Sequence, residues 1–221
     1  MSKTAIILGA TGLTGSILLE KLIANNYYKK IILFSRNSVT NTSTKIEEHL
    51  IDLLKLEEYK DQFIGDEVFC CIGTTGSKTK NKKLYKRIDY GIPVSAANLA
   101  KQNNINTFIV ISSMGADVES SMFYNRTKGE MERDVLQQNI KNTFILRPSL
   151  IGGKRNEFRF GEKIGKGIMS ILNPLFMGNL KKYKMIHPKE IANCMQILAS
   201  KTENERIISS DKILTIANYK E

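Results

Sequence analysis

The sequence predicts an α/β fold in which a parallel β-sheet is covered by helices on both faces. Strand-like and helix-like patterns alternate along the chain, and a glycine-rich turn joins the first strand to the first helix. Such alternation is typical of βαβ units, whose crossover helices pack on both faces of a parallel sheet. The chain has 221 residues, of which 42% are hydrophobic, and contains no repeat or evident linker. We therefore expect one domain over residues 1–221 with a sizeable core.

Short runs of β-branched and aliphatic residues predict the strands, which are Lys3–Leu8, Lys30–Ser35, Lys45–Ile51, Glu67–Ile72, Thr107–Ser112 and Thr143–Leu146. Apolar residues at helical spacing predict helices over 13–25, 81–103, 122–139, 157–172 and 188–200. The region from about residue 150 to 221 is expected to be a small C-terminal appendage on the substrate side.

The first strand runs directly into a turn with the spacing of a phosphate-binding loop. Gly9, Gly12 and Gly15 follow Leu8 as G-x-x-G-x-x-G, and a helical pattern begins at once. In Rossmann-type, doubly wound sheets the first glycine permits the tight turn, the second lets backbone approach a pyrophosphate, and the third lets helix and strand pack closely. The amide groups at the start of the helix suit an anion. The order of strand, glycine turn and helix therefore predicts a dinucleotide site.

The end of the second strand bears on the choice of cofactor. An NAD-binding fold usually has an acid there for the ribose 2′-hydroxyl, whereas a basic residue accommodates the 2′-phosphate of NADP. This chain has Ser35-Arg36-Asn37, and no acid occurs between Glu20 and Glu47. The planar guanidinium of Arg36 can bind a phosphate or stack on adenine. The sequence thus favours NADP(H) over NAD(H).

A possible catalytic group follows the fifth strand. That strand ends in Ser112-Ser113, and Tyr124 and Lys128 come next on an expected helix. Residues four apart share one helical face. A lysine charge makes a nearby phenol more acidic, and a serine hydroxyl can orient a carbonyl for proton transfer coupled to hydride transfer. These residue types indicate carbonyl or alcohol chemistry with a nicotinamide cofactor.

Charge and cysteine content point to no other class of site. The formal net charge is +11, and six of the ten residues from Lys78 to Arg87 are basic. Since lysine, asparagine and isoleucine are frequent throughout, we interpret this cluster as a solvated helix start near the cofactor phosphates, and expect no nucleic-acid partner. The three cysteines form no C-x-x-C, and the two histidines lie far apart, so no metal site is predicted.

The sequence also predicts a cellular location and a class of partner. The N-terminus has no apolar signal segment, and no apolar run approaches the roughly 18 residues that a membrane span needs. We therefore expect a cytoplasmic protein without a membrane partner. We also expect a small-molecule substrate, whose identity the sequence does not give, and a protein that is a monomer or a homodimer.

Several motifs occur together, in consistent order, between about residues 4 and 200. They are the glycine turn, Ser35-Arg36-Asn37, Cys70-Cys71-Ile72-Gly73-Thr74-Thr75, Ile111-Ser112-Ser113-Met114-Gly115-Ala116, Tyr124-x-x-x-Lys128-Gly129-Glu130 and Leu146-Arg147-Pro148. Together they resemble the atypical short-chain dehydrogenase/reductases. Within these, the chain is most similar to the small NADPH-binding branch that includes a human HIV Tat-interactive, oxidoreductase-like protein and bacterial homologues.

The resemblance implies an NAD(P)-binding oxidoreductase that transfers hydride to or from a small carbonyl or alcohol. It implies that Ser113, or Ser112 if the register shifts by one, acts with Tyr124 and Lys128 as a catalytic triplet. The implied cofactor contacts are Gly9, Thr11, Gly12, Leu13, Thr14 and Gly15 on the pyrophosphate, Arg36 on the 2′-phosphate, Asp52 and Leu53 on the adenine, Cys71, Ile72, Gly73, Thr74 and Lys128 on the ribose side, and Pro148 with residues 149 to Ile151 near the nicotinamide amide.

Two departures from the longer relatives argue against epimerase chemistry. Where those relatives carry an asparagine, in the helix after the fourth strand, this chain has Asp89-Tyr90, and it is too short for a large sugar-binding lobe. Neither departure affects NADPH binding. An NADPH-binding regulatory or sensor protein with little or no turnover remains the alternative to an oxidoreductase, because both need the same cofactor contacts.

Overall fold

The computed structural model describes residues 2–152, 184–200 and 205–219. Its strands are β1 (Lys3–Leu8), β2 (Tyr28–Ser35), β3 (Ile46–Leu50), β4 (Glu67–Cys70), β5 (Thr107–Ile111), β6 (Asn142–Arg147) and β7 (Ile207–Ser209). Its helices are α1 (Leu13–Ala24), α2 (Lys82–Lys86), α3 (Ile92–Gln102), α4 (Phe123–Gln137), α6 (Pro188–Ser200) and α7 (Ser210–Ala217). A 3₁₀ segment η1 (Leu53–Tyr59) and a π-helical turn η2 (Arg87–Gly91) complete the described elements.

The strands form a seven-stranded parallel sheet in the order β3-β2-β1-β4-β5-β6-β7. Strand β1, in the interior of the sheet, pairs with β2 on one side and with β4 on the other, so that Ile6 lies between Ile32 and Val68. The chain builds outward from β1 to β3 and then starts again on the other side of β1 at β4. In open α/β sheets ligands bind at such a switch point, outside the carboxyl ends of the strands. The predicted doubly wound sheet is confirmed.

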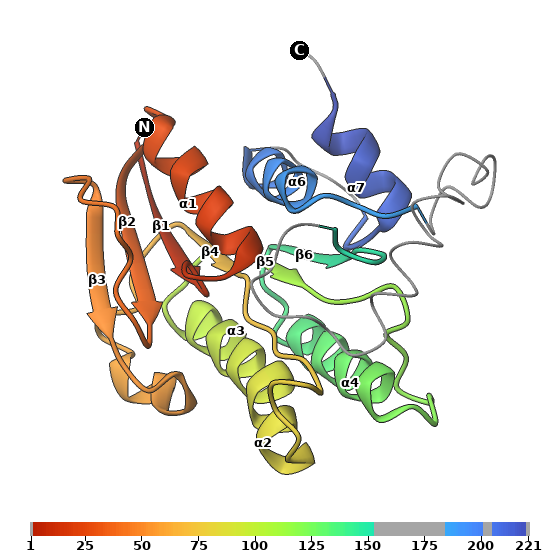
Figure 1. Cartoon of the computed structure of the whole chain (residues 1–221). Helices are drawn as coiled ribbons and strands as arrows, with labels where there is room; N and C mark the ends of the chain where they lie inside the picture. Colours follow the sequence, from red (N-terminus) through yellow and green to blue (C-terminus); the bar gives the residue numbers. More distant parts are fainter. Residues whose placement is uncertain (1, 153–183, 201–204, 220–221) are drawn as a thin grey trace.

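The sheet separates two hydrophobic cores because alternate residues of each strand point to opposite faces. Ala5 and Ile7 of β1 join the core under α1, α6 and α7, whereas Ile6 and Leu8 join the core under α3 and α4. The two layers of helices are visible on either side of the sheet (Figure 1). Strands buried on both faces explain why the sequence shows continuous apolar runs rather than alternation.

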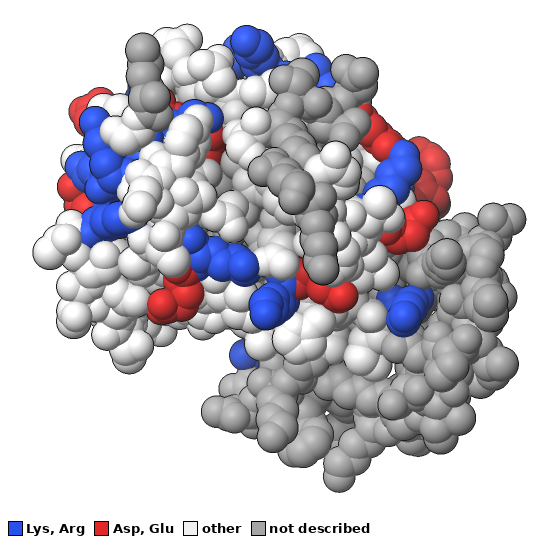
Figure 2. Space-filling model, turned by 90° about the horizontal axis from the view of Figure 1, so that it is seen from above, with Lys and Arg blue, Asp and Glu red and all other residues white. Residues whose placement is uncertain are grey.

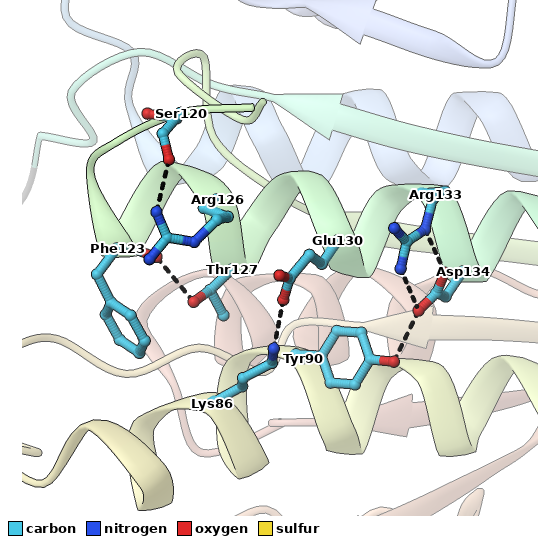
Figure 3. Close-up of polar contacts among 9 residues, drawn as sticks. All are labelled: Lys86, Tyr90, Ser120, Phe123, Arg126, Thr127, Glu130, Arg133 and Asp134. Carbon is cyan, nitrogen blue, oxygen red and sulfur yellow. Dashed lines mark hydrogen bonds and ion pairs between the residues drawn. The ribbon is translucent and has the colours of Figure 1, made fainter. Parts of the chain in front are cut away.

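Helix α4 is attached to the segment below it by polar contacts along one face (Figure 3). Lys86 Nζ lies 2.6 Å from Glu130 Oε2, and the Tyr90 hydroxyl donates to Asp134 Oδ2 at 2.7 Å. Lys86 belongs to α2, and Tyr90 belongs to η2. These contacts hold the middle of α4 against α2 and the π-helical turn η2. Single π-helical turns are frequent at functional sites.

The C-terminal region contributes more to the sheet than the sequence predicts. Strand β7 pairs in parallel with β6, and the following helix α7 packs on the α1 side. Neither element was predicted. Helix α6, expected over 188–200, is confirmed, whereas the expected helix over 157–172 lies outside the described residues. The predicted helix over 81–103 consists of α2, η2 and α3, which follow one another without a break.

Acidic and basic side chains are mixed on the surface. On the face seen from above, Lys and Arg side chains lie among Asp and Glu side chains (Figure 2). Among the helices of the described residues, none has the length and apolar character that a membrane crossing requires. In the same part of the chain, His, Cys, Asp and Glu side chains form no group of three that could hold a metal ion.

Candidate functional site

The glycine turn lies at the carboxyl end of β1 and leaves no space for a side chain at Gly9 or Gly15. Gly9 has φ +85°, in the left-handed region, and a Cβ there would lie 2.9 Å from the carbonyl oxygen of Cys71. A Cβ at Gly15 would lie 2.1 Å from the carbonyl oxygen of Gly9. The Gly12 N–H donates to the same oxygen at 3.0 Å. The three glycines thus close the turn tightly against both β4 and α1.

The start of α1 fits a dinucleotide pyrophosphate. Gly12 is the N-cap, no side chain caps the helix, and its first turn contains no acidic residue. The first amide groups of an α-helix have no partner within the helix, and its N-terminus carries partial positive charge. Thr11, Leu13 and Thr14 complete this segment, so their backbone groups could hold the anion where the sequence predicts it.

The adenine end of the predicted site lies at the ends of two neighbouring strands. Ser35 pairs with Leu50, and the Ile51 N–H donates to the Ser35 carbonyl at 2.9 Å, so the turns after β2 and β3 are adjacent. Arg36 is exposed in the first turn. In the second, Asp52 caps η1 by accepting from the Leu54 N–H at 3.0 Å. The buried Leu53 follows it.

The loop after β4 is fixed to the glycine turn and to η2. The Cys71 N–H donates to the Leu8 carbonyl at 2.9 Å, which places Cys71 and Ile72 beside Gly9. Further along, the Thr74 N–H donates to Asp89 Oδ2 at 2.7 Å. The predicted ribose-side residues therefore form one edge of the site, and Asp89 connects that edge to the helical layer.

Asp89 also holds Lys128. The two side chains are 1% and 4% exposed, and Lys128 Nζ lies 2.9 Å from Asp89 Oδ1. Burial by itself would lower the pKa of Lys128, but the charge of Asp89, with a smaller contribution from Tyr124, outweighs burial and raises it. Lys128 is therefore a buried, positively charged side chain whose charge is balanced by a carboxylate.

The adjacent serines have different environments. The Ser112 hydroxyl is buried and donates to Glu132 Oε1. Glu132 in turn accepts from Arg147, whose Nε lies 3.0 Å from both carboxylate oxygens. The Ser113 hydroxyl oxygen is also buried, yet it has no hydrogen-bond partner among the described residues. A buried hydroxyl without a partner is uncommon and requires an explanation.

Tyr124 lies in the first turn of α4, one helical turn before Lys128, and is 38% exposed. Its ring packs edge-on against Tyr85, with 6.3 Å between the ring centroids. A pocket of about 600 Å³ opens beside it, between the loop after β4 and the starts of α2 and α4. A substrate could therefore reach the phenol from solvent.

The loop after β6 lies next to the loop after β5. The Met114 N–H donates to the Pro148 carbonyl at 3.1 Å, so Pro148 is adjacent to the Ser113 segment. Ile151 forms an isolated parallel bridge with Ile186 just before α6. The implied nicotinamide-side residues are thus at the same edge of the sheet as the rest of the site.

Sequence reasoning missed two carboxylates that organise this edge. It noted Asp89 only as a departure from longer relatives, and it gave Glu132 no role. Both are nearly fully buried, at 1% and 3% exposure. A buried carboxylate in a chain with a large basic excess suggests a specific cation partner, but the sequence does not show which residues are buried.

Fold and site together define a Rossmann-type dinucleotide-binding protein of the short-chain dehydrogenase/reductase kind. The family model described as NAD(P)H-binding matches residues 9–165. HTATIP2 of Rattus norvegicus is 34% identical over 169 residues, which cover 75% of this chain and 69% of that protein. FMP52 of Candida albicans is 36% identical over 159 residues, covering 70% and 69%. The chain belongs to this NAD(P)H-binding family and is an atypical short-chain dehydrogenase/reductase similar to HTATIP2.

Solved structures support the fold. MoeE5 in complex with UDP-glucose and NAD has a TM-score of 0.68 at 16% identity, with 97% of this chain and 80% of that chain covered. The UDP-glucose 4-epimerase of Thermotoga maritima with UDP-glucose has a TM-score of 0.69 at 14% identity, with 97% and 81% covered. At these identities the likeness shows the Rossmann-type fold alone.

The expected cytoplasmic location is contradicted by the relatives. The FMP52 proteins of Candida albicans, Debaryomyces hansenii and Aspergillus niger are named mitochondrial. The prediction rested on the lack of an apolar signal segment. Because mitochondrial transit peptides are amphipathic rather than apolar, that observation does not distinguish the two locations.

Proposed function

We propose that this protein is an NADP(H)-dependent oxidoreductase acting on a small carbonyl or alcohol. The observation that carries the proposal is the buried Ser113 hydroxyl, which has no partner among the described residues. It follows β5, at the edge where Tyr124 and Lys128 of α4 also lie. An orphaned hydroxyl is costly to bury, so its retention directly after β5, at the carboxyl edge of the sheet, supports a role toward a substrate oxygen.

In the proposed reaction the chain supplies the proton and the orientation. The bound dihydronicotinamide supplies a hydride to the carbonyl carbon while the oxygen takes a proton, so that carbonyl compound, NADPH and a proton give an alcohol and NADP⁺. The Tyr124 hydroxyl donates that proton. The Ser113 hydroxyl donates a hydrogen bond to the same oxygen and stabilises its developing charge.

Lys128 and Asp89 form a buried ion pair close to the proposed proton donor, Tyr124. The carboxylate of Asp89 keeps the buried lysine charged, since it raises the pKa that burial alone would lower. The charged lysine lies one helical turn after Tyr124, on the same face of α4. Asp89 also accepts from the Thr74 N–H. One carboxylate therefore couples the loop on the ribose side to the lysine on α4.

The test of the catalytic role is Tyr124→Phe, measured on whichever carbonyl a screen of aldehydes, ketones and quinones with NADPH identifies. We expect turnover to fall by about 10²-fold or more with little change in cofactor affinity. Tyr27→Phe is the matched control. Tyr27 is 40% exposed, and it immediately precedes β2, so it lies at the amino end of the strand whose carboxyl end borders the candidate site. Equal rates for wild type and Tyr124→Phe would refute the role. Absence of any turnover, with a partner protein binding only when NADPH is present, would favour a sensor instead.

The preference for NADP(H) rests on Arg36, which is exposed in the turn after β2, where the sequence contains no acid between Glu20 and Glu47. We propose that its guanidinium binds the 2′-phosphate. NADPH should then bind at least about tenfold more tightly than NADH, a difference of roughly 1.4 kcal/mol. Arg36→Ala should abolish this ratio, while Arg133→Ala, which removes the same charge from α4, should preserve it. Fluorescence titration measures both affinities, and a preference that survives Arg36→Ala would overturn the assignment.

A further inference from the structure

The pocket beside Tyr124 has a distinct composition. Its volume of about 600 Å³ lies within the range of small-molecule sites. Its described lining comes from the loop after β4, from α2 and from the first turn of α4, and consists of Thr74, Thr75, Gly76, Ser77, Thr79, Lys80, Lys82, Tyr85, Phe123 and Tyr124. The lining combines aromatic rings, hydroxyls and lysines, and no carboxylate occurs among these residues.

The aromatic rings form one wall. Tyr85 packs edge-on against Phe123 at 5.7 Å and against Tyr124 at 6.3 Å, measured between ring centroids. The ring of Phe123 projects from α4 toward the segment that contains α2 (Figure 3). Aromatic side chains favour stacked or edge-to-face contacts with other flat groups. This wall therefore suits a flat, aromatic or conjugated compound better than a branched aliphatic one.

The lysines give the pocket a positive charge, and no counterion for them occurs in the part of the chain that the structure describes. Lys80 and Lys82 are exposed, and neither forms an ion pair with another described residue, whereas the neighbouring Lys86 is paired with Glu130 at 2.6 Å. Lys82 Nζ lies 5.7 Å from the centroid of the Phe123 ring. A ligand stacked on the aromatic wall would therefore have an ammonium group close by. Part of the basic cluster from Lys78 to Arg87 thus faces a pocket rather than bulk solvent alone.

We propose that this pocket binds an aromatic or conjugated carbonyl compound that also carries an anionic group such as a carboxylate. The aromatic ring of this ligand packs against Tyr85 and Phe123, and its carbonyl oxygen reaches the Tyr124 hydroxyl. Its anionic group pairs with Lys82 and Lys80. This substrate class rests on the proposed reductase function, and the reaction is the same reduction of a carbonyl by NADPH. The anionic group of the ligand contributes to binding affinity and not to the chemical step, since the lysines contact no reacting atom.

The test compares 4-carboxybenzaldehyde with its neutral methyl ester, methyl 4-formylbenzoate, with NADPH as reductant. We expect kcat/KM for the acid to exceed that for the ester by about two- to fivefold, the range that an exposed ion pair gives. Lys82→Met, which keeps the apolar stem, should remove this preference. Lys83→Met is the matched control, because it removes the same charge from the next residue of α2, which does not line this pocket.

The outcomes separate this inference from the proposed function. If both aldehydes are reduced at equal rates, or the ester is preferred, the substrate class is wrong while the reductase stands. If neither is reduced, 4-carboxybenzaldehyde is titrated calorimetrically into the NADP⁺-loaded protein. Binding that Lys82→Met weakens by about two- to fivefold, and Lys83→Met does not, then supports the pocket as an aromatic-anion site although reduction fails. Absence of binding in that titration overturns the inference.

Discussion

Replacing Asp89 by asparagine should destabilise the protein by about 3–5 kcal/mol, the typical cost of removing one partner from a buried ion pair. The full figure applies because the two side chains are only 1% and 4% exposed and their charged atoms are 2.9 Å apart. The asparagine amide oxygen can still accept from the Thr74 N–H, so the substitution isolates the loss of charge. For a domain of 150–250 residues, about 2–4 °C per kcal/mol gives a melting temperature roughly 6–20 °C lower.

The pH dependence of stability should change as well. In the wild type the Lys128 pKa is raised, so the stabilising contribution of the pair is complete below about pH 10.5 and is lost only as pH rises through the folded-state value. In Asp89→Asn, burial becomes the dominant influence and lowers the Lys128 pKa. The unfolded chain then binds more protons than the folded one, so the free energy of unfolding should increase with pH up to about 10.5.

Urea denaturation from pH 6 to 10 measures both effects, and a double variant supplies the control. Lys128→Met alone leaves the Asp89 carboxylate buried without its cation, so it should be destabilising too. Asp89→Asn combined with Lys128→Met removes both charges and should be more stable than either single variant, with no additional pH dependence. A loss below about 1 kcal/mol in Asp89→Asn, or strictly additive effects in the double variant, would refute the buried-pair reasoning.

Four further substitutions, at two glycines and two serines, test other parts of the site. Gly15→Ala should destabilise the fold strongly and abolish cofactor binding, because the new Cβ would lie 2.1 Å from the carbonyl oxygen of Gly9. At Gly12 the corresponding distance is 3.2 Å, so Gly12→Ala should chiefly weaken NADPH binding. Circular dichroism and NADPH titration together distinguish loss of the fold from loss of binding. Ser113→Ala should reduce kcat by about 10²-fold with little change in stability, since its hydroxyl has no partner among the described residues. Ser112→Ala should do the reverse, losing about 1–3 kcal/mol because Glu132 loses a donor, and a larger kinetic effect at Ser112 than at Ser113 would exchange their roles.

Local features were predictable because they depend on residues close together in the chain. The strand, turn and helix around Gly9 follow from an apolar run, glycine spacing and helical periodicity, all within 24 residues of the N-terminus. Tyr124 and Lys128 share a face of α4 for the same reason. By contrast, β7 has only three residues, too few for a periodic pattern, and it exists through its pairing with β6.

The amino-acid sequence by itself therefore determined the order of the strands and helices from β1 to β6, the glycine turn and the residue types available for chemistry. Only the tertiary structure decided how those residues are partnered. It paired Asp89 with Lys128, which come from different elements, and it directed the hydroxyl of Ser112 to Glu132 while leaving that of Ser113 without a partner among the described residues. Burial makes such pairings decisive, since a charge or hydroxyl removed from water must find its partner within the fold.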